Sequence, residues 1–187
     1  GTVALTKALL PHFIKNKAGT FVTITSLMGK FGSPYRSGYC GAKHALHGFF
    51  DVLRMEHQKD NIQVTLICPG FIQTNVAKNA LTADGSKQNT DDEATQNGMP
   101  VAVFAQKLIR AVEKEQFEAT IGGKETLGVL LKRFFPTYLH YFVLRSKALY
   151  YSTVSANNRL DIRSFNLESR ELKSLVQGSI NSIRRFS

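Results

Sequence analysis

The chain has 187 residues, of which 43% are hydrophobic and 20% charged, and its formal net charge is +10. This composition is ordinary for a soluble globular protein, and the length suffices for one domain with a substantial core. Two cysteines, Cys40 and Cys68, are too few for a disulfide framework, so we expect two small buried thiols. The sequence starts with Gly1 inside a helical pattern, and we therefore expect a part of a longer protein.

The first half of the chain alternates helical and strand patterns. A helix is expected over 1–17, where Pro11 should kink it or end its regular part. A short β-branched run at 20–25 and a second apolar run at 61–68 are typical of strands buried on both faces of a parallel sheet. Between them, a glycine-containing loop leads into a helix over 37–59.

The second half contains a helix, a strand and a change of character. The polar stretch 74–100 is interpreted as a mobile lid over the substrate, because long polar segments near a site are commonly functional. The apolar spacing predicts an amphipathic helix over 101–115, and a third strand follows at 117–121. Residues 126–151 are apolar and aromatic, whereas 152–187 are polar and basic, with disorder favoured over an ordered role.

Most of the positive charge lies after residue 120, where eleven Lys and Arg face four Asp and Glu. Such a basic end suggests an anionic partner, either a membrane surface or nucleic acid, although a solvated tail explains it equally well. Charged residues interrupt 126–151, so it is a poor transmembrane span. We interpret it as an amphipathic helix at a membrane surface or a helix on a partner subunit, and do not predict nucleic acid binding.

Tyr39 and Lys43 are the strongest candidates for chemistry. Four residues apart on a helix, they lie about one turn from each other on the same face. A nearby ammonium favours the phenolate and should lower the pKa of Tyr39, so that its hydroxyl can exchange protons near neutral pH. Ser26 ends the first predicted strand, where its hydroxyl could hold a substrate oxygen. The alternative is a packed tyrosine beside a solvated lysine.

These residues, with two further motifs in the same order, resemble the short-chain dehydrogenase/reductase family over about residues 1–125. The resemblance rests on Ser26, on the run Tyr39-Cys40-Gly41-Ala42-Lys43, on Pro69-Gly70-Phe71-Ile72-Gln73-Thr74 after the second strand, and on Gly1-Thr2-Val3-Ala4-Leu5-Thr6 with Leu10-Pro11 in the first helix. The tyrosine–lysine spacing alone would be weak evidence, because it occurs by chance in many helices.

The resemblance implies a hydride transfer between a nicotinamide cofactor, NADP or NAD, and a small-molecule carbonyl or alcohol. It makes Tyr39 the general acid/base, Ser26 the partner of the substrate oxygen, and Lys43 the group that tunes Tyr39 and holds the nicotinamide ribose. The cofactor-binding residues implied are Tyr39, Lys43, Pro69, Gly70, Ile72 and Thr74, with the backbone of Ile72 and Thr74 facing the carboxamide.

The fold implied is α/β, the carboxyl-terminal half of a Rossmann-like, doubly wound parallel sheet. The domains expected are a partial catalytic domain at 1–125, an amphipathic helix at 126–151 and a basic tail at 152–187. The glycine-rich phosphate turn and the residue that selects NAD or NADP are absent from the sequence. We therefore expect the 187 residues alone to bind cofactor poorly.

The sequence leaves several alternatives open. A homodimer through helices 1–17 and 37–59 is implied by the resemblance, and the location expected is cytoplasmic or peripheral on an intracellular membrane. The chain could instead be a non-catalytic membrane- or partner-binding protein with a relic site. His44 and His47 are three apart, but we find no third ligand at a suitable spacing and predict no metal site.

Overall fold

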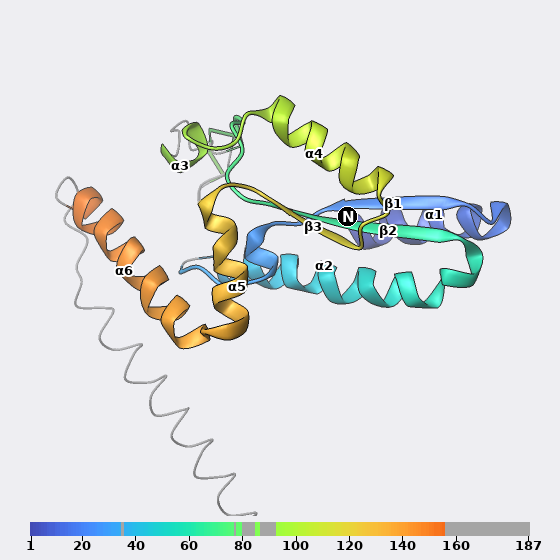
Figure 1. The fold of residues 1–187 in the computed structure, drawn as a ribbon, viewed down its shortest axis with the longest axis horizontal. Coiled ribbons are helices and arrows are strands. Elements are labelled where there is room, and N and C mark those ends of the chain that lie inside the picture. The colour runs from blue at the N-terminus through green and yellow to red at the C-terminus, as the bar shows by residue number, and fades with distance from the viewer. Residues whose placement is uncertain (35, 77, 80–84, 87–92, 156–187) are drawn as a thin grey trace, which may run out of the picture. The chain divides into compact units, whose positions relative to one another are not determined.

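Three parallel strands form the sheet of the computed structural model, which describes residues 1–34, 36–76, 78–79, 85–86 and 93–155 (Figure 1). Strand β1 (Gly19–Ile24) pairs with β2 (Ile62–Pro69), and β2 pairs with β3 (Glu118–Ile121), in the order β1-β2-β3. The register aligns Gly19 with Ile62 and Leu66 with Glu118. The carboxyl ends of all three strands therefore lie at one edge of the sheet.

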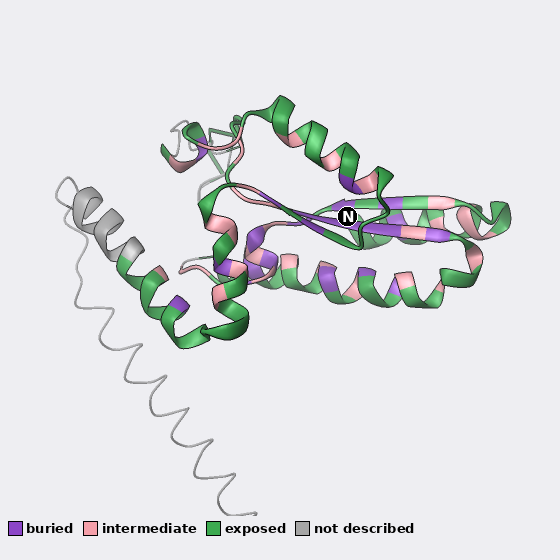
Figure 2. Cartoon of the chain, in the orientation of Figure 1, coloured by how far each residue is buried: buried purple, intermediate pink, exposed green. Residues whose placement is uncertain are grey.

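Helices cover both faces of this sheet. Helices α1 (Thr2–Asn16) and α2 (Ser37–Glu56) pack on one face, and α4 (Val101–Glu113) packs on the other (Figures 1 and 2). The larger core, beneath α1 and α2, contains Phe21, Phe50, Leu53, Ile62, Val64 and Leu66. The core beneath α4 contains Ile67, Ala111, Ala119 and Ile121. Helices on both faces of a parallel sheet confirm the predicted α/β class.

Short helical turns connect these elements. Turn η1 (Leu27–Gly29) follows β1, η2 (Gln58–Asp60) follows α2, and η3 (Lys124–Thr126) follows β3. A four-residue helix, α3 (Glu93–Gln96), precedes α4. It lies in the segment predicted as a lid, of which 77, 80–84 and 87–92 fall outside the described residues. The basic tail beyond residue 155 also lies outside them.

The strands and helices expected in the first 121 residues are confirmed, with bounds shifted by a few residues. Helix α1 continues through Pro11 to Asn16, so the prolyl residue does not end it. It ends at Lys17, in the left-handed conformation at φ 52°, and the Lys17 amide donates to the carbonyl of Ile14. Asn61 turns the chain in the same way before β2, with φ 56°.

The region predicted as one amphipathic helix at 126–151 instead forms two helices, α5 (Leu127–Phe134) and α6 (Pro136–Ser155). Pro136 provides the physical reason, because a proline disfavours helical geometry at the residue before it and is well tolerated at a helix start. Phe135 accordingly leaves the helical region at φ −136° and ψ 60°. None of the helices in the described part of the chain has the length and apolar character needed to cross a membrane.

The chain divides into two compact units, Gly1–Val143 and Leu144–Ser187. Within the first unit, Leu139 of α6 is buried in a third apolar cluster with Leu27 and Phe31. The beginning of α6 therefore packs on the segment that follows β1. The expectation that the first strand is buried on both faces is wrong: Val22 and Ile24 of β1 are exposed on the face opposite α2, because α4 packs against β2 and β3. No other described strand pairs with the second edge of β1.

Candidate active site

Ser26 lies directly after β1 and begins η1. Its hydroxyl oxygen accepts a hydrogen bond from the Met28 amide at 3.1 Å, which caps this turn. The side chain is half-buried at the carboxyl-terminal edge of the sheet. Ligands of open parallel sheets bind beyond this edge, so the position agrees with a role in a site.

Lys43 connects α2 to the end of β1. Its ammonium nitrogen donates to the carbonyl of Ile24 at 3.1 Å and lies 5.6 Å from the centre of the Tyr39 ring. The Tyr39 side chain is 45% exposed and can reach a molecule in solution. Among the described residues no hydrogen bond joins Tyr39 to Ser26. The carbonyl that Lys43 contacts belongs to Ile24, which lies two residues before Ser26. The Lys43 ammonium thus lies between the Tyr39 ring and the end of β1.

The Pro69–Gly70 turn after β2 is held by Glu125 from η3. The Oε1 atom of Glu125 accepts hydrogen bonds from the amides of Phe71, at 3.0 Å, and Gly123, at 2.9 Å. A Cβ atom at Gly70 would collide with this carboxylate, so a larger residue there would displace the Glu125 side chain. The Gly70 amide donates to Ile121 at 2.9 Å and extends the pairing of β2 with β3.

The chain after Gly70 lines a cavity of about 370 Å³. Its wall is formed by Phe71, Ala94, Asn97, Gly98, Met99, Gly123 and Glu125. Ile72 lies beside this wall and forms a single parallel bridge with Met99, while Thr74 is exposed and accepts a hydrogen bond from Val76 at 3.4 Å. The wall includes none of Ser26, Tyr39 and Lys43, so this cavity and the predicted catalytic residues are separate features of one sheet edge.

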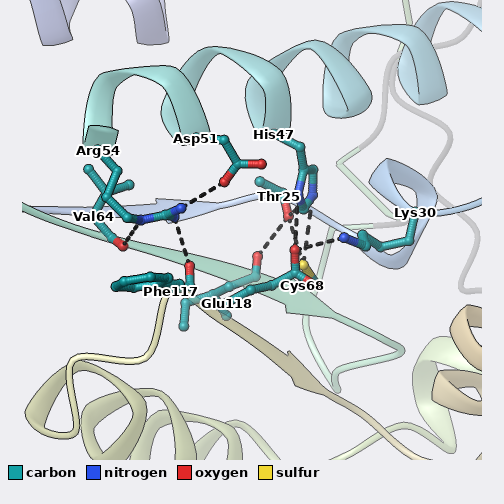
Figure 3. A network of polar contacts seen from close by, with 10 residues as sticks. Thr25, Lys30, His47, Asp51, Arg54, Val64, Cys68, Phe117 and Glu118 are labelled. Atoms are coloured by element: carbon teal, nitrogen blue, oxygen red, sulfur yellow. Dashed lines mark hydrogen bonds and ion pairs between the residues drawn. The ribbon is translucent and has the colours of Figure 1, made fainter. Parts of the chain in front are cut away.

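A polar network lies beneath α2, on the sheet face that also carries the larger core (Figure 3). His47 points from α2 toward the strands, with Nε2 3.1 Å from the Thr25 hydroxyl and 3.8 Å from the Cys68 sulfur. Its Nδ1 atom lies 3.3 Å from Oε2 of Glu118, which also contacts the Lys30 ammonium at 2.7 Å. The network therefore joins α2 to β2, to β3 and to Thr25, the residue that follows β1.

Side-chain contacts in this network shift two pKa values. The contacts with Cys68 and then Glu118 raise the pKa of His47 to about 9, against the opposing effect of burial. The contact with His47, followed by Lys30, lowers the pKa of Glu118 to about 2. The imidazole is thus held in its charged form beside a carboxylate at neutral pH.

Gly29 allows η1 to approach α2 closely beside this network. A Cβ atom at this glycine would lie 2.8 Å from Nε2 of His47 and 3.1 Å from the Lys43 carbonyl oxygen. Because η1 follows Ser26 directly, this approach sets the spacing between Ser26 and the helix that carries Tyr39 and Lys43.

Comparisons with known proteins identify the family. The model of the short chain dehydrogenases matches residues 1–85, which include Ser26, Tyr39, Lys43 and Pro69–Gly70. Dehydrogenase/reductase SDR family member 7B of Mus musculus is 40% identical over 164 residues, covering 88% of this chain and 48% of that protein. The chain belongs to the short-chain dehydrogenase/reductase family. A family protein 7-like relative from Anopheles gambiae is 36% identical over 148 residues, covering 79% of this chain and 47% of its own length.

Solved structures of short-chain dehydrogenases share the fold. One from Streptomyces avermitilis is 24% identical, with a TM-score of 0.55 over 82% of this chain and 57% of its own. Another, from Burkholderia cenocepacia and in complex with NADP, is 18% identical, with a TM-score of 0.61 over 76% of this chain and 54% of its own. The three-stranded sheet is therefore part of a Rossmann-like arrangement. The chain spans about half the length of the curated relatives that it matches.

Two features of the site escaped the sequence analysis. The sequence indicated Glu125 only as one charge in a basic segment, although it lies two residues after Gly122-Gly123, which follow a predicted strand. His47 was paired with His44, but His44 faces the carbonyl of Cys40 at 2.8 Å, whereas His47 is buried against Cys68 and Glu118. The alternation of β2 carried a usable signal, because Cys68 shares the parity of Ile62, Val64 and Leu66 and so must face α2.

Proposed function

We propose that this protein is a nicotinamide-dependent oxidoreductase that interconverts a carbonyl and an alcohol, with Tyr39 as general acid/base. The observation that carries the proposal is the contact of the Lys43 ammonium with both the Tyr39 ring, at 5.6 Å, and the last carbonyl of β1, at 3.1 Å. An ammonium in that place stabilises negative charge on the phenol oxygen during proton transfer. The membership of the chain in the short-chain dehydrogenase/reductase family supports the same reaction class.

Each residue then has a distinct task. In the reducing direction, Tyr39 donates its hydroxyl proton to the substrate oxygen, and in the oxidising direction it takes this proton back. Ser26 donates a hydrogen bond to the same oxygen and stabilises the charge that develops there. When bound, the cofactor supplies or accepts the hydride at the substrate carbon.

The residues present fit a nicotinamide cofactor, NADP or NAD. The Lys43 ammonium has three donors, of which one goes to Ile24, so it can also hold ribose hydroxyl groups. The Pro69–Gly70 turn brings backbone without a side chain to the edge of the sheet, beside Ile72 and Thr74, which would face the carboxamide. A relative of known structure is in complex with NADP, which supports the choice of cofactor class.

The test of this function is cofactor binding by the natural protein, including any residues that its gene encodes beyond these 187. A cofactor present at a hundred times its dissociation constant should stabilise the fold by about 2.7 kcal/mol. We expect NADP⁺ or NAD⁺ to raise the unfolding temperature, and Lys43→Met to reduce that rise. The variant Lys107→Met, on α4, is the control. The proposal is wrong if neither nucleotide shifts the unfolding temperature of a folded sample.

A second candidate function, binding to a membrane surface, is favoured by the aromatic residues of α5 and α6. Exposed aromatic side chains gather along these helices: Phe134, Phe135, Tyr138, Tyr141 and Phe142. Lys132 and Arg133 lie in the last turn of α5. Aromatic residues beside basic ones are typical of segments that lie at the interface of anionic membranes.

Sedimentation with vesicles tests this candidate. We expect binding to vesicles that contain phosphatidylserine, weaker binding at high salt, and a loss of binding in the double variant Phe134→Ser/Phe135→Ser. Val101→Ser, which alters an exposed apolar residue of α4, is the control. Equal sedimentation of wild type with and without vesicles would exclude this function.

A further inference from the structure

The buried polar network beneath α2 contains three side chains of the kinds that bind transition metals. His47, Cys68 and Glu118 each offer one donor atom, and these atoms all lie within 4.8 Å of one another. They come from α2, β2 and β3, so the packed sheet and helix hold them together (Figure 3). From these positions we infer that His47, Cys68 and Glu118 form a binding site for one zinc-like divalent metal ion.

The chemistry of the donors suits this class of ion. Imidazole nitrogen, thiolate sulfur and carboxylate oxygen are the ligands of zinc, at about 2.0–2.2 Å for nitrogen and oxygen and about 2.3 Å for sulfur. A bound ion takes the His47 ring in its neutral form, so binding releases the proton that this imidazole holds at neutral pH. The Thr25 hydroxyl, 3.1 Å from His47 and 3.3 Å from Cys68, provides a further oxygen beside them.

Burial distinguishes this cluster from a surface group. His47 is only 8% exposed and Cys68 is fully buried. The Nδ1 atom of His47 is buried, and its 3.3 Å approach to the Glu118 carboxylate is an ion pair that lacks the alignment of a hydrogen bond. An ion between the imidazole and the carboxylate would take the place of this contact.

Lys30 is the competing cation. Its ammonium lies 2.7 Å from Oε2 of Glu118 and neutralises the carboxylate from its outer side. The Lys30 side chain is 28% exposed and can turn toward solvent when an ion takes its place. A network of ion pairs without a metal is the rival explanation, and the two explanations predict opposite effects of removing this lysine.

Titration of the chelator-treated full chain with Co²⁺ tests the site without any assay of activity. We expect one equivalent of cobalt to produce the sulfur-to-cobalt charge-transfer absorption of a thiolate ligand. Cys68→Ser should abolish this band, whereas Cys40→Ser, which removes the other thiol of the chain, should retain it. Glu118→Gln should weaken binding at least roughly tenfold, as expected for a site that loses a ligand.

The variant Lys30→Gln decides between the explanations. A metal site binds Co²⁺ and Zn²⁺ more tightly once the competing charge is gone, and Zn²⁺ then raises the unfolding temperature further. Circular dichroism establishes that each variant is folded before titration. The inference is overturned if folded wild type shows no thiolate band, if the band survives in Cys68→Ser, or if Lys30→Gln binds the ion less tightly. These outcomes do not depend on hydride transfer.

Discussion

At Glu125 one carboxylate oxygen accepts hydrogen bonds from two backbone amides, at 3.0 Å from Phe71 and 2.9 Å from Gly123. These bonds join the turn after β2 to the turn after β3, on the wall of the cavity. A charged acceptor makes stronger hydrogen bonds than a neutral one. The shape of the Pro69–Gly70 segment, to which we assign cofactor contacts, therefore depends on this side chain.

Glu125→Ala should lower the free energy of unfolding by about 1–3 kcal/mol, because it removes a charged acceptor from two backbone amides. Glu125→Gln should lose less stability, since the oxygen of the side-chain amide can still accept both hydrogen bonds. Chemical denaturation measures both values. Glu113→Ala, at an exposed position of α4, is the control and should change the stability by less than about 0.5 kcal/mol. Equal stability of wild type and Glu125→Ala would contradict this role.

At the scale of elements, α2 carries most of the site on one side. Tyr39, Lys43 and His47 are spaced by four residues and therefore share a face of the helix. Arg54, further along, donates to the carbonyls of Val64 at 3.2 Å and Phe117 at 3.0 Å, which fixes the helix over β2 and the start of β3 (Figure 3). The position of α2 over the sheet thus determines where its reactive groups lie.

Gly29→Ala should destabilise the protein by about 1–3 kcal/mol, because the added methyl group meets the Lys43 carbonyl and the His47 ring. The matched control is Gly48→Ala on α2, where a Cβ meets no atom within 4 Å. That change should stabilise by about 0.5–1 kcal/mol through helix propensity. Thermal and denaturant unfolding measure both. If both alanine variants behave alike, η1 does not pack on α2 as closely as described.

Much of this element scale could be predicted from the sequence, because periodicity reports which face of an element is buried. The strands, α2 and α4 follow from such patterns. The break at Phe135 was missed, although Pro136 carries the signal, because the apolar run was interpreted by its composition. The network of His47, Cys68 and Glu118 could not be predicted, since parallel pairing of distant segments brings its members together.

At the scale of the whole molecule, the outer sides of α1 and α2 are unusually apolar. Leu5 of α1 is 63% exposed and Met55 of α2 is 67% exposed, and Val3, Leu9 and Val52 are exposed as well. Both helices cover the same face of the sheet. Exposed apolar side chains on neighbouring elements are typical of subunit interfaces, which supports the homodimer proposed through these helices.

Analytical ultracentrifugation tests this dimer on the purified protein. We expect wild type to sediment as a dimer and Leu5→Glu/Met55→Glu to sediment as a folded monomer, because each interface would bury unpaired carboxylates. Val101→Glu, at an exposed apolar position on α4, should leave the dimer intact. A monomeric wild type, or a double variant that remains dimeric, would contradict the proposed interface.

The hydride-transfer proposal depends on the phenol of Tyr39. The turnover number of the Tyr39→Phe variant is the measurement that tests the proposal most directly. The natural protein, with any residues encoded beyond these 187, is assayed by nicotinamide absorbance with the carbonyl or alcohol that it converts fastest. Tyr39→Phe should lower kcat at least about 100-fold, as expected for the loss of a general acid/base, with little change in cofactor affinity. Tyr138→Phe, at an exposed position of α6, should retain full activity. Wild-type kcat in Tyr39→Phe would contradict the assignment.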